Sequence, residues 1–148
     1  MDNIDRKILT ILQENARTPL KVIAEQVFLS SPAVSARIER LEASGMIMGY
    51  QAQLSGAQMG YQIKAFISLD LEPVRKTEFY PYVEKCPNVM ECNCVTGDYS
   101  MLLKVCFSTT QELDHFIDQL QSFGRTRTQI VFSTPVEHRG IPVMEEEA

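Results

Sequence analysis

The spacing of apolar residues divides the chain into two parts near residue 62. Before residue 50, apolar residues recur every three or four positions, which is typical of the buried face of a helix. After residue 62, several stretches alternate apolar and polar residues, as half-buried strands do, and helical spacing returns between them. The pattern predicts two domains, residues 1–50 and 63–148, joined by a linker or hinge strand at residues 51–62.

The N-terminal part predicts three helices. The first covers residues 2–15, and Thr18 is expected to cap the second, with Pro19 at its first position. Ser31 is expected to cap the third in the same way, with Pro32 at the first helical position.

The third predicted helix has an apolar face and an opposite face of small and basic residues. Its apolar stripe consists of Val34, Ile38 and Leu41. The small residues on the other side and its flanks are Pro32, Ala33, Ser35 and Ala36. They would let the helix backbone approach a partner closely, while Arg37 and Arg40 reach past them to phosphates or base edges.

A short turn at residues 28–30 separates the second and third helices, and this order predicts a helix-turn-helix. Taken alone, the third helix fits a solvated surface helix equally well. The two helices before it favour DNA binding over a generic three-helix bundle. We expect Gly45 to end the third helix in a left-handed conformation, and residues 46–54 to be extended, as a wing or hinge strand.

The C-terminal part predicts the order βαββαβ, which is the ferredoxin-like arrangement. The strands are predicted at residues 65–71, 89–96, 101–107 and 126–132. A helix is expected over residues 73–86, where Pro81 either starts or kinks it, and a second begins at a capping box, Thr109 with Glu112, and ends at Gly124. The fold class is therefore α+β, and residues 144–148 are expected to form a solvated acidic tail.

The charge is unevenly distributed along the chain. The net charge is −5, but residues 1–50 contain six basic and six acidic residues, so the surplus negative charge follows residue 50. A neutral module can still present a basic face, although so few cations imply low nonspecific affinity and favour binding as an oligomer.

Composition also limits the other function classes. There is no charged and then apolar leader and no apolar run long enough for a membrane span, so a cytoplasmic protein without a membrane partner is expected. The four cysteines fit that compartment as reduced residues. Cys92 and Cys94 are too close in sequence for the usual zinc spacing, and His115 and His138 are the only histidines, so no metal or other cofactor is expected.

Several short motifs, in order, resemble the Lrp/AsnC regulators (leucine-responsive and asparagine-responsive, or feast/famine, proteins). These motifs are Ile4-Asp5-Arg6-Lys7-Ile8-Leu9, Asn15-Ala16-Arg17, Arg37-Ile38-Glu39-Arg40-Leu41-Glu42 with Gly45 and Ile47, Thr96-Gly97-Asp98-Tyr99-Ser100, and Arg125-Thr126-Arg127-Thr128-Gln129-Ile130-Val131. Each is weak alone, but their order and spacing are specific, and they cover nearly the whole chain.

The resemblance implies a transcription regulator: an N-terminal winged helix-turn-helix joined to a ferredoxin-like domain that senses a small molecule. It further implies homodimers formed through the C-terminal sheets and gathered into tetramers or octamers. Amino-acid effectors in such proteins bind between sensing domains, near the glycine-containing loop. Carried onto this sequence, the effector residues are Thr96, Gly97, Asp98, Tyr99 and Ser100, with Thr126 and Thr128 of the last strand as companions.

The residues of this loop support two interpretations. Gly97 can expose backbone amides to a carboxylate, and Asp98 and Ser100 offer acceptors for an ammonium group beside the Tyr99 ring. Without the resemblance, a plain hairpin turn is favoured, because Gly-Asp is ordinary turn chemistry. Many relatives have an acid in place of Ser100, so a polar effector is as good an expectation as leucine, and loss of effector binding stays open.

For double-stranded promoter DNA, the expected base-reading side chains are Ser35, Ala36, Arg37 and Arg40. The expected phosphate contacts are Arg17, Lys21 and Ser31. The alternative for each cation is a solvated charge, and for Arg37 a pair with Glu39 or Glu42 on the same helix. An enzyme is disfavoured because no nucleophile is paired with a base, so no catalytic residue is expected. A helix-turn-helix that contacts only protein is the other alternative.

Overall fold

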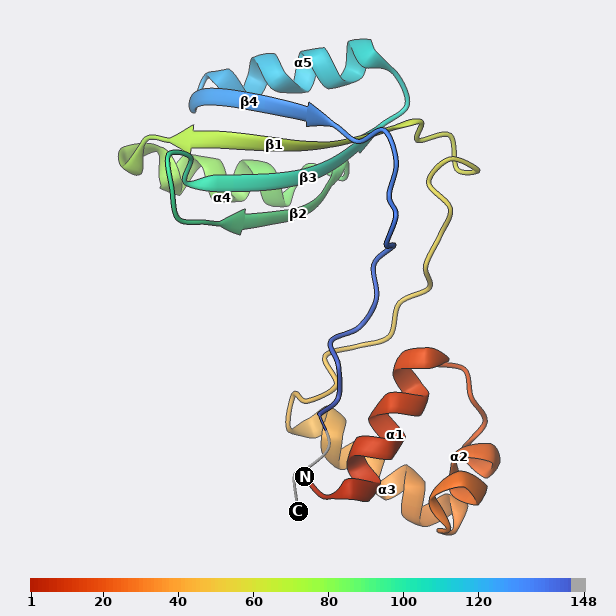
Figure 1. The fold of residues 1–148 in the computed structure, drawn as a ribbon. Coiled ribbons are helices and arrows are strands. Elements are labelled where there is room, and N and C mark those ends of the chain that lie inside the picture. Colours follow the sequence, from red (N-terminus) through yellow and green to blue (C-terminus); the bar gives the residue numbers. More distant parts are fainter. Residues whose placement is uncertain (145–148) are drawn as a thin grey trace. The chain divides into compact units, whose positions relative to one another are not determined.

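The structure, a computed structural model, describes residues 1–144 of the chain. It divides into two compact units: residues 1–52 with the segment from residue 137 onward, and residues 53–136. In Figure 1 the first unit holds the red and orange helices and the second holds the sheet. Residues 137–144 thus belong to the N-terminal unit, although the predicted division placed them in the C-terminal domain. Of the predicted acidic tail, residues 145–148 lie outside the described residues.

The N-terminal unit contains α1 (Asn3–Glu14), α2 (Leu20–Val27) and α3 (Ser31–Ala43) around an apolar core. The buried residues of this core are Ile8, Ile23, Ala24, Val27 and Val34. They come from the stripes that helical spacing predicted, and the three-helix arrangement is confirmed.

Helix α3 begins slightly differently from the prediction and ends as predicted. Ser30, not Ser31, is the N-cap, and its hydroxyl accepts a hydrogen bond from the Ala33 backbone N–H at 3.3 Å. Pro32 therefore takes the second helical position, where a backbone N–H would have no intrahelical partner either. Gly45 follows the helix with a φ of 74°, the left-handed conformation expected of it.

Helix α2 begins with Pro19 in the cap position and no side-chain cap. The Thr18 hydroxyl, predicted to cap it, instead donates to the Asn15 carbonyl oxygen at 2.7 Å. The helix ends at Phe28, whose φ of 56° is left-handed and whose side chain is 91% exposed. A side chain is disfavoured in this conformation because Cβ crowds the following carbonyl, so the tight turn into α3 imposes it.

The predicted wing is not a strand. Between α3 and β1 (Ile63–Leu71), the described chain forms no sheet, and Met48 and Leu54 are mostly exposed. The Tyr50 hydroxyl donates to Glu42 Oε1 at 2.8 Å, which ties the start of this segment to α3. An extended chain needs a partner strand to become a sheet, and none lies beside it in the described residues.

The C-terminal unit has the predicted ferredoxin-like fold. β1, β2 (Val89–Cys94), β3 (Met101–Phe107) and β4 (Gly124–Ile130) form an antiparallel sheet in the order β2-β3-β1-β4. α4 (Lys76–Glu84) and α5 (Thr110–Gln121) pack against one face of it. The largest buried side chains between helices and sheet include Ile67, Leu69, Phe79, Leu103, Phe116 and Leu120.

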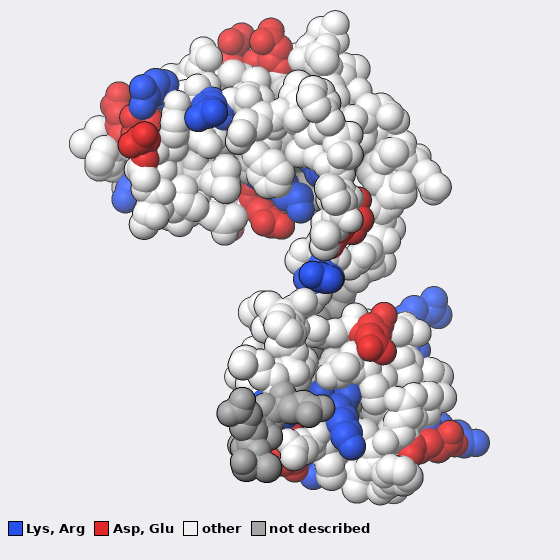
Figure 2. All heavy atoms as spheres, viewed as in Figure 1, with Lys and Arg blue, Asp and Glu red and all other residues white. Residues whose placement is uncertain are grey.

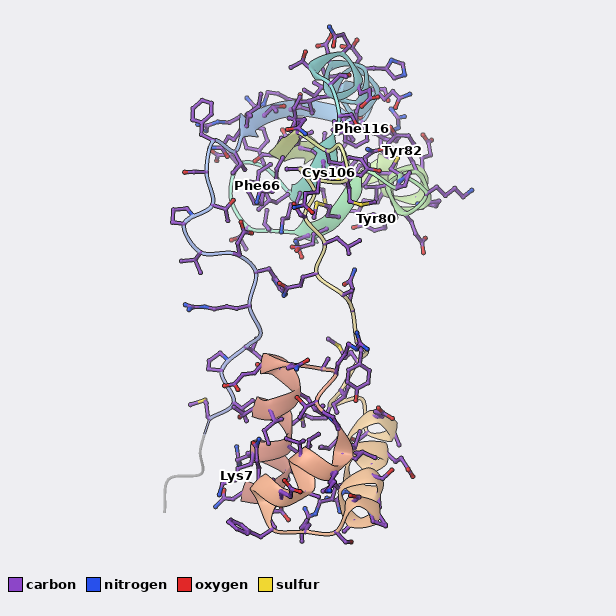
Figure 3. The ribbon with its side chains drawn as sticks, turned by 90° about the vertical axis from the view of Figure 1, so that its right-hand side faces the viewer. Lys7, Phe66, Tyr80, Tyr82, Cys106 and Phe116 are labelled. Atoms are coloured by element: carbon purple, nitrogen blue, oxygen red, sulfur yellow. The ribbon has the colours of Figure 1, made fainter. Side chains whose placement is uncertain are left out.

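The sheet has a filled face and an open one. Phe116 and Tyr82 lie on the helix side, whereas Phe66 and Cys106 alternate with the buried positions of β1 and β3 and lie on the other side (Figure 3). The predicted capping box is confirmed, since Thr109 accepts from the Glu112 N–H at 3.2 Å and Glu112 accepts from the Thr109 N–H at 3.3 Å.

Three details differ from the prediction. Pro81 lies inside α4 and does not start it; a short 3-10 helix, η1 (Pro73–Arg75), precedes α4 instead. Gly124 does not end α5 but begins β4, where a Cβ would overlap the Asp70 carbonyl oxygen of β1. β4 ends at Ile130, so Phe132, predicted in the strand, lies beyond it and is fully exposed.

Candidate DNA-binding surface and effector loop

The outward face of α3 is small and largely free of bulky side chains. Pro32 and Ala36 are exposed, and Ser31, Ala33 and Ser35 are partly exposed on the same helix. The Ser35 hydroxyl donates to Glu39 Oε1 at 3.0 Å, so the one acid on this face is held by its own helix. The face can therefore approach a flat or grooved partner at the level of its backbone.

The two arginines of α3 reach back to α1. Arg37 Nη1 lies 2.7 Å from Asp2 Oδ2 and 2.7 Å from Asp5 Oδ1. Arg40 Nη2 lies 3.1 Å from Asp5 Oδ1 and 3.0 Å from Asp5 Oδ2. Asp5 is only 2% exposed and is the only buried charged residue among those described. We call these four residues the Asp5 cluster.

The cluster sets the charge state of its acids. Burial raises the pKa of Asp5, but hydrogen bonds from the Arg37 guanidinium and the Asp2 backbone more than offset it, so the pKa ends below its usual value. The pKa of Asp2 is lowered mainly by the Asp5 backbone N–H and then by Arg37. Both acids also form the capping box of α1. The cluster thus joins the start of α1 to the middle of α3.

The two arginines differ in how much of each remains available. The Arg37 side chain is 23% exposed and the Arg40 side chain is 63% exposed. The pairing of Arg37 with Glu39 or Glu42, weighed from sequence, is not the one observed. Glu42 accepts from Tyr50, and burial together with this carboxylate raises the pKa of Tyr50 to about 12.

The cations expected to contact phosphates lie elsewhere on the unit. Arg17 precedes α2 and Lys21 lies in its first turn, and both are exposed. In the space-filling view, basic and acidic side chains are interspersed on the visible face and form no large patch of one sign (Figure 2). Any electrostatic contribution to DNA binding therefore comes from a few placed cations.

The loop between β2 and β3 is anchored by one of its own members. The Ser100 backbone N–H donates to the Leu69 carbonyl oxygen at 3.1 Å, and its hydroxyl accepts from the Leu71 N–H at 3.1 Å. The Val95 N–H closes the loop by donating to the Ser100 carbonyl oxygen at 2.9 Å. Ser100 is therefore committed to holding the loop against β1.

The rest of the loop faces outward beside Arg125. Gly97 has a φ of 108°, which favours glycine, and Thr96 and Asp98 are exposed. The Arg125 guanidinium lies 5.1 Å from the centre of the Tyr99 ring, and Asp70 is 3.9 Å from it. Such a stack holds the cation over the aromatic face.

The threonines of β4 lie on the other side of the strand from Arg125. Thr126 and Thr128 pair with the buried Leu69 and Ile67, so they share the helix face of the sheet. Sequence reasoning therefore missed Arg125 as the nearer companion of the loop. It also missed Asp2 and Asp5, because acids in the first turn of a helix are already accounted for by capping and by the helix dipole.

Other chemistry is sparse in the part of the chain that the structure describes. Residues 1–144 contain no group of three or more His, Cys, Asp or Glu side chains arranged to hold a metal ion. No helix among them is long and apolar enough to cross a membrane. His115 is exposed and hydrogen-bonds Gln119 at 3.2 Å, and burial raises the pKa of the Cys92 and Cys106 thiols.

Comparison with protein families matches both units. Residues 1–42 match the AsnC-type helix-turn-helix domain, and residues 64–141 match the Lrp/AsnC ligand binding domain. The chain is 33% identical over 146 residues to the HTH-type transcriptional regulator FL11 of Pyrococcus furiosus, covering 97% of each chain. It is 30% identical to the regulator LrpA of Bacillus subtilis, covering 88% of this chain and 97% of that protein.

Solved structures agree with these matches. A crystal structure of a transcriptional regulator from Neisseria meningitidis in complex with L-Met is 29% identical, with a TM-score of 0.90 and coverage of 97% of each chain. AsnC of E. coli is 31% identical, with a TM-score of 0.81 and coverage of 96% of this chain and 99% of that one.

The Asp5 cluster predicts how the N-terminal unit responds to acid. Because the folded-state pKa of Asp5 is lowered, its contribution is fully present above the usual value of 3.8 and is lost as pH falls through the lower folded pKa. We expect Asp5→Asn to lower the free energy of unfolding of this unit at pH 7 by about 1–3 kcal/mol. The difference from wild type should shrink below about pH 4.

The measurement is thermal unfolding followed by amide NMR signals of α1 to α3 between pH 3 and pH 7. Glu25→Gln, which changes an exposed acid of α2, is the matched control and should follow wild type. Equal melting temperatures for wild type and Asp5→Asn at pH 7 would show that the cluster does not stabilise the unit.

Proposed function

We propose that this chain, which belongs to the Lrp/AsnC family of transcriptional regulators, binds promoter DNA sequence-specifically through α3 and responds to an amino acid held by its ligand-binding unit. The family membership supplies the helix-turn-helix and the ligand-binding domain. The observation that carries the finer proposal is the face of α3: small exposed residues beside an arginine whose side chain is 63% exposed.

On DNA, the small face would enter the major groove and Arg40 would read a base edge. Its guanidinium has five N–H donors, so the part not used on Asp5 can still pair with a guanine. The close-approach residues are Ser31, Pro32, Ala33, Ser35 and Ala36. Arg17 and Lys21 would contact phosphates and set register and salt dependence without choosing sequence.

Arg37 takes a different part in this proposal. Its guanidinium hydrogen-bonds both Asp2 and Asp5, and most of its side chain is covered. Releasing it to DNA would leave the Asp5 carboxylate short of a partner in a buried place, which is unfavourable. We therefore assign Arg37 to fixing the angle of α3 on α1, and Arg40 to the DNA contact.

For the effector, we propose an α-amino acid bound at the β2–β3 loop, between the ligand-binding units of neighbouring chains. The relative from Neisseria meningitidis is a complex with L-Met, which supports this class of ligand. In this chain the exposed Asp98 suits the ammonium group, and the Gly97 amides and Arg125 suit the carboxylate. Thr96, Tyr99 and Ser100 would shape the loop, with Thr126 and Thr128 beneath it.

Regulation then follows from linkage. A ligand that binds one arrangement of neighbouring chains more tightly shifts the population towards it. In a homodimer, or in the tetramers and octamers that dimers could build, such a shift changes the spacing of the α3 helices on DNA. No chemical step is involved, in agreement with relatives that are transcriptional regulators and not enzymes.

The DNA-binding proposal predicts that Arg40→Ala weakens binding to the promoter region upstream of the chain's own gene by about 1–3 kcal/mol, because a base contact is lost. The measurement is a gel-shift titration at fixed salt concentration. The control is Glu25→Gln on α2, which changes a charge away from α3. Equal affinity of Arg40→Ala and wild type would remove Arg40 from the DNA-reading residues.

The effector proposal predicts that at least one of the twenty amino acids raises the melting temperature of the protein. A ligand at one hundred times its Kd adds about 2.7 kcal/mol to the stability of the folded state. Asp98→Ala should abolish this shift while leaving the unliganded melting temperature unchanged, because Asp98 is exposed. A thermal-shift screen in which no amino acid acts, or in which Asp98→Ala retains the full shift, would contradict the assigned site.

A further inference from the structure

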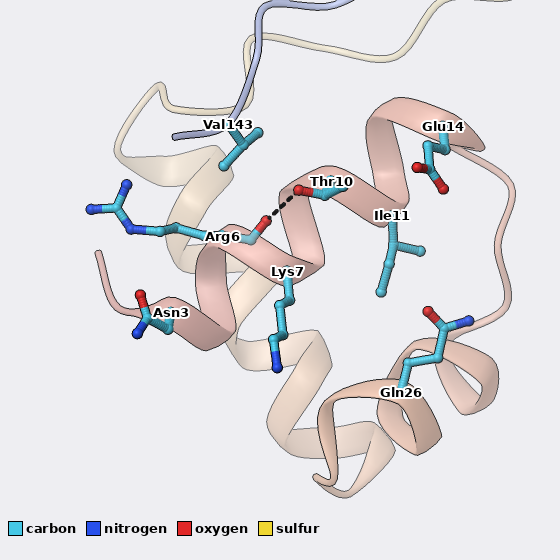
Figure 4. A pocket seen from close by; sticks show the side chains of 8 residues that line it. All are labelled: Asn3, Arg6, Lys7, Thr10, Ile11, Glu14, Gln26 and Val143. Atoms are coloured by element: carbon cyan, nitrogen blue, oxygen red, sulfur yellow. Dashed lines mark hydrogen bonds between the residues drawn. The ribbon is translucent and has the colours of Figure 1, made fainter. Parts of the chain in front are cut away.

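The C-terminal segment of this chain lies against the DNA-binding unit. After β4 the chain returns, and residues 137–144 belong to the same compact unit as α1, α2 and α3. The segment has no helix or strand of its own. The last described residues run over a groove on α1, which is shown closely in Figure 4.

The groove has polar walls and an apolar floor. Its lining side chains are Asn3, Arg6, Lys7, Thr10, Ile11, Glu14, Gln26 and Val143. Seven of these come from α1 and α2, and the eighth, Val143, comes from the returning segment and lies over the Arg6–Thr10 turn. Ile11 supplies apolar surface from the helix, so Val143 has a partner for its side chain.

Two further contacts fix the segment in this place. Arg6 Nη1 donates to the Met144 carbonyl oxygen at 2.6 Å. Gly140 lies so close to α1 that a Cβ there would be 2.7 Å from Gln13 Cδ. The segment is therefore held at both ends, by a close backbone approach at Gly140 and by a charge-assisted hydrogen bond at Met144.

Only one side chain of the segment faces the helix. Val143 is partly buried, whereas Ile141 is 79% exposed and Met144 is 76% exposed. The contact is thus specific to position 143 and to the backbone, and a general hydrophobic collapse would have covered all three. This alternation provides a matched pair of positions, 141 and 143, within one short segment.

We propose that the groove on α1 is the docking site of this chain's own residues 140–144, which act as a second tether between the two units. The chain passes from the N-terminal unit to the other unit at residues 52–53 and returns at residues 136–137. Two connections restrict the DNA-binding unit more than one does, because each closed loop removes conformational freedom.

Charge favours this occupant. The groove carries Arg6 and Lys7 on its walls, with Glu14 as its one acid. In the sequence, Met144 is followed by three glutamates and the terminal alanine. An acidic chain end suits a groove with two basic side chains at low and moderate salt.

The tether does not act by covering the DNA-reading helix. Pro32, Ala36 and Arg40 are exposed while residues 137–144 lie on α1. Docking therefore leaves the α3 face open and changes how far the unit can move from its ligand-binding unit. This role goes beyond the proposed promoter and amino-acid binding and requires neither of them.

The test uses the full-length protein and NMR relaxation of the backbone amides of residues 140–144. In wild type we expect order parameters near 0.8, close to the value of about 0.85 for rigid backbone. Val143→Asp places a carboxylate against Ile11 and should lower them below about 0.6, the range of a flexible chain end. Ile141→Asp, the matched control, should leave them at the wild-type value because Ile141 faces solvent.

Identical order parameters in the two variants, or values below about 0.6 in wild type, would overturn the proposal. A mixing experiment identifies the source of the segment. Isotope-labelled chains truncated after Arg139 are refolded with unlabelled full-length chains, and the Ile11 methyl signal of the labelled chains is compared with that of intact protein. A signal that stays at its truncated position supports docking of the chain's own segment, and a return to the intact position would assign the groove to a second copy.

Discussion

The N-terminal unit depends on one buried carboxylate. Asp5 is 2% exposed, and such a charge is tolerated only where opposite charges and hydrogen bonds compensate for lost water. The compensation comes from Arg37 and Arg40, which lie more than thirty positions away on α3. Because both guanidinium groups must meet one carboxylate, the cluster restricts the angle at which α3 crosses α1. A helix that enters a groove needs this kind of fixed orientation.

The same cluster separates two residues that look equivalent in sequence. Arg37 and Arg40 lie three positions apart on one helix, and both suit phosphates or base edges. In the fold, Arg37 hydrogen-bonds two acids and is mostly covered, whereas Arg40 keeps 63% of its side chain exposed. Arg37 therefore contributes to the shape of the DNA-binding unit, and Arg40 is the one placed to contact a partner. At the other unit, Ser100 and Asp98 divide the loop in a comparable way: Ser100 anchors it to β1, and Asp98 remains exposed.

Periodicity was sufficient to predict the elements, because a helix or strand shows its buried face within a few residues. The stripes of α1, α3 and α5 and the alternation in β1 and β3 were all readable. Contacts between distant segments were not. The partner of Asp5 depends on how α3 crosses α1, and the place of Arg125 depends on the register of β4 against β1. The return of residues 137–144 to α1 leaves almost no pattern, since only Val143 of that segment turns inward.

The division of roles between the arginines is tested most directly by comparing Arg37→Met with Arg40→Met in melting temperature and in promoter affinity. We expect Arg37→Met to lower the melting temperature of the N-terminal unit by roughly 4–8 °C for each kcal/mol of stability that is lost. We expect Arg40→Met to melt within a few degrees of wild type, and to lose about 1–3 kcal/mol of DNA affinity. An Arg37→Met protein that melts like wild type but no longer binds DNA would contradict this account.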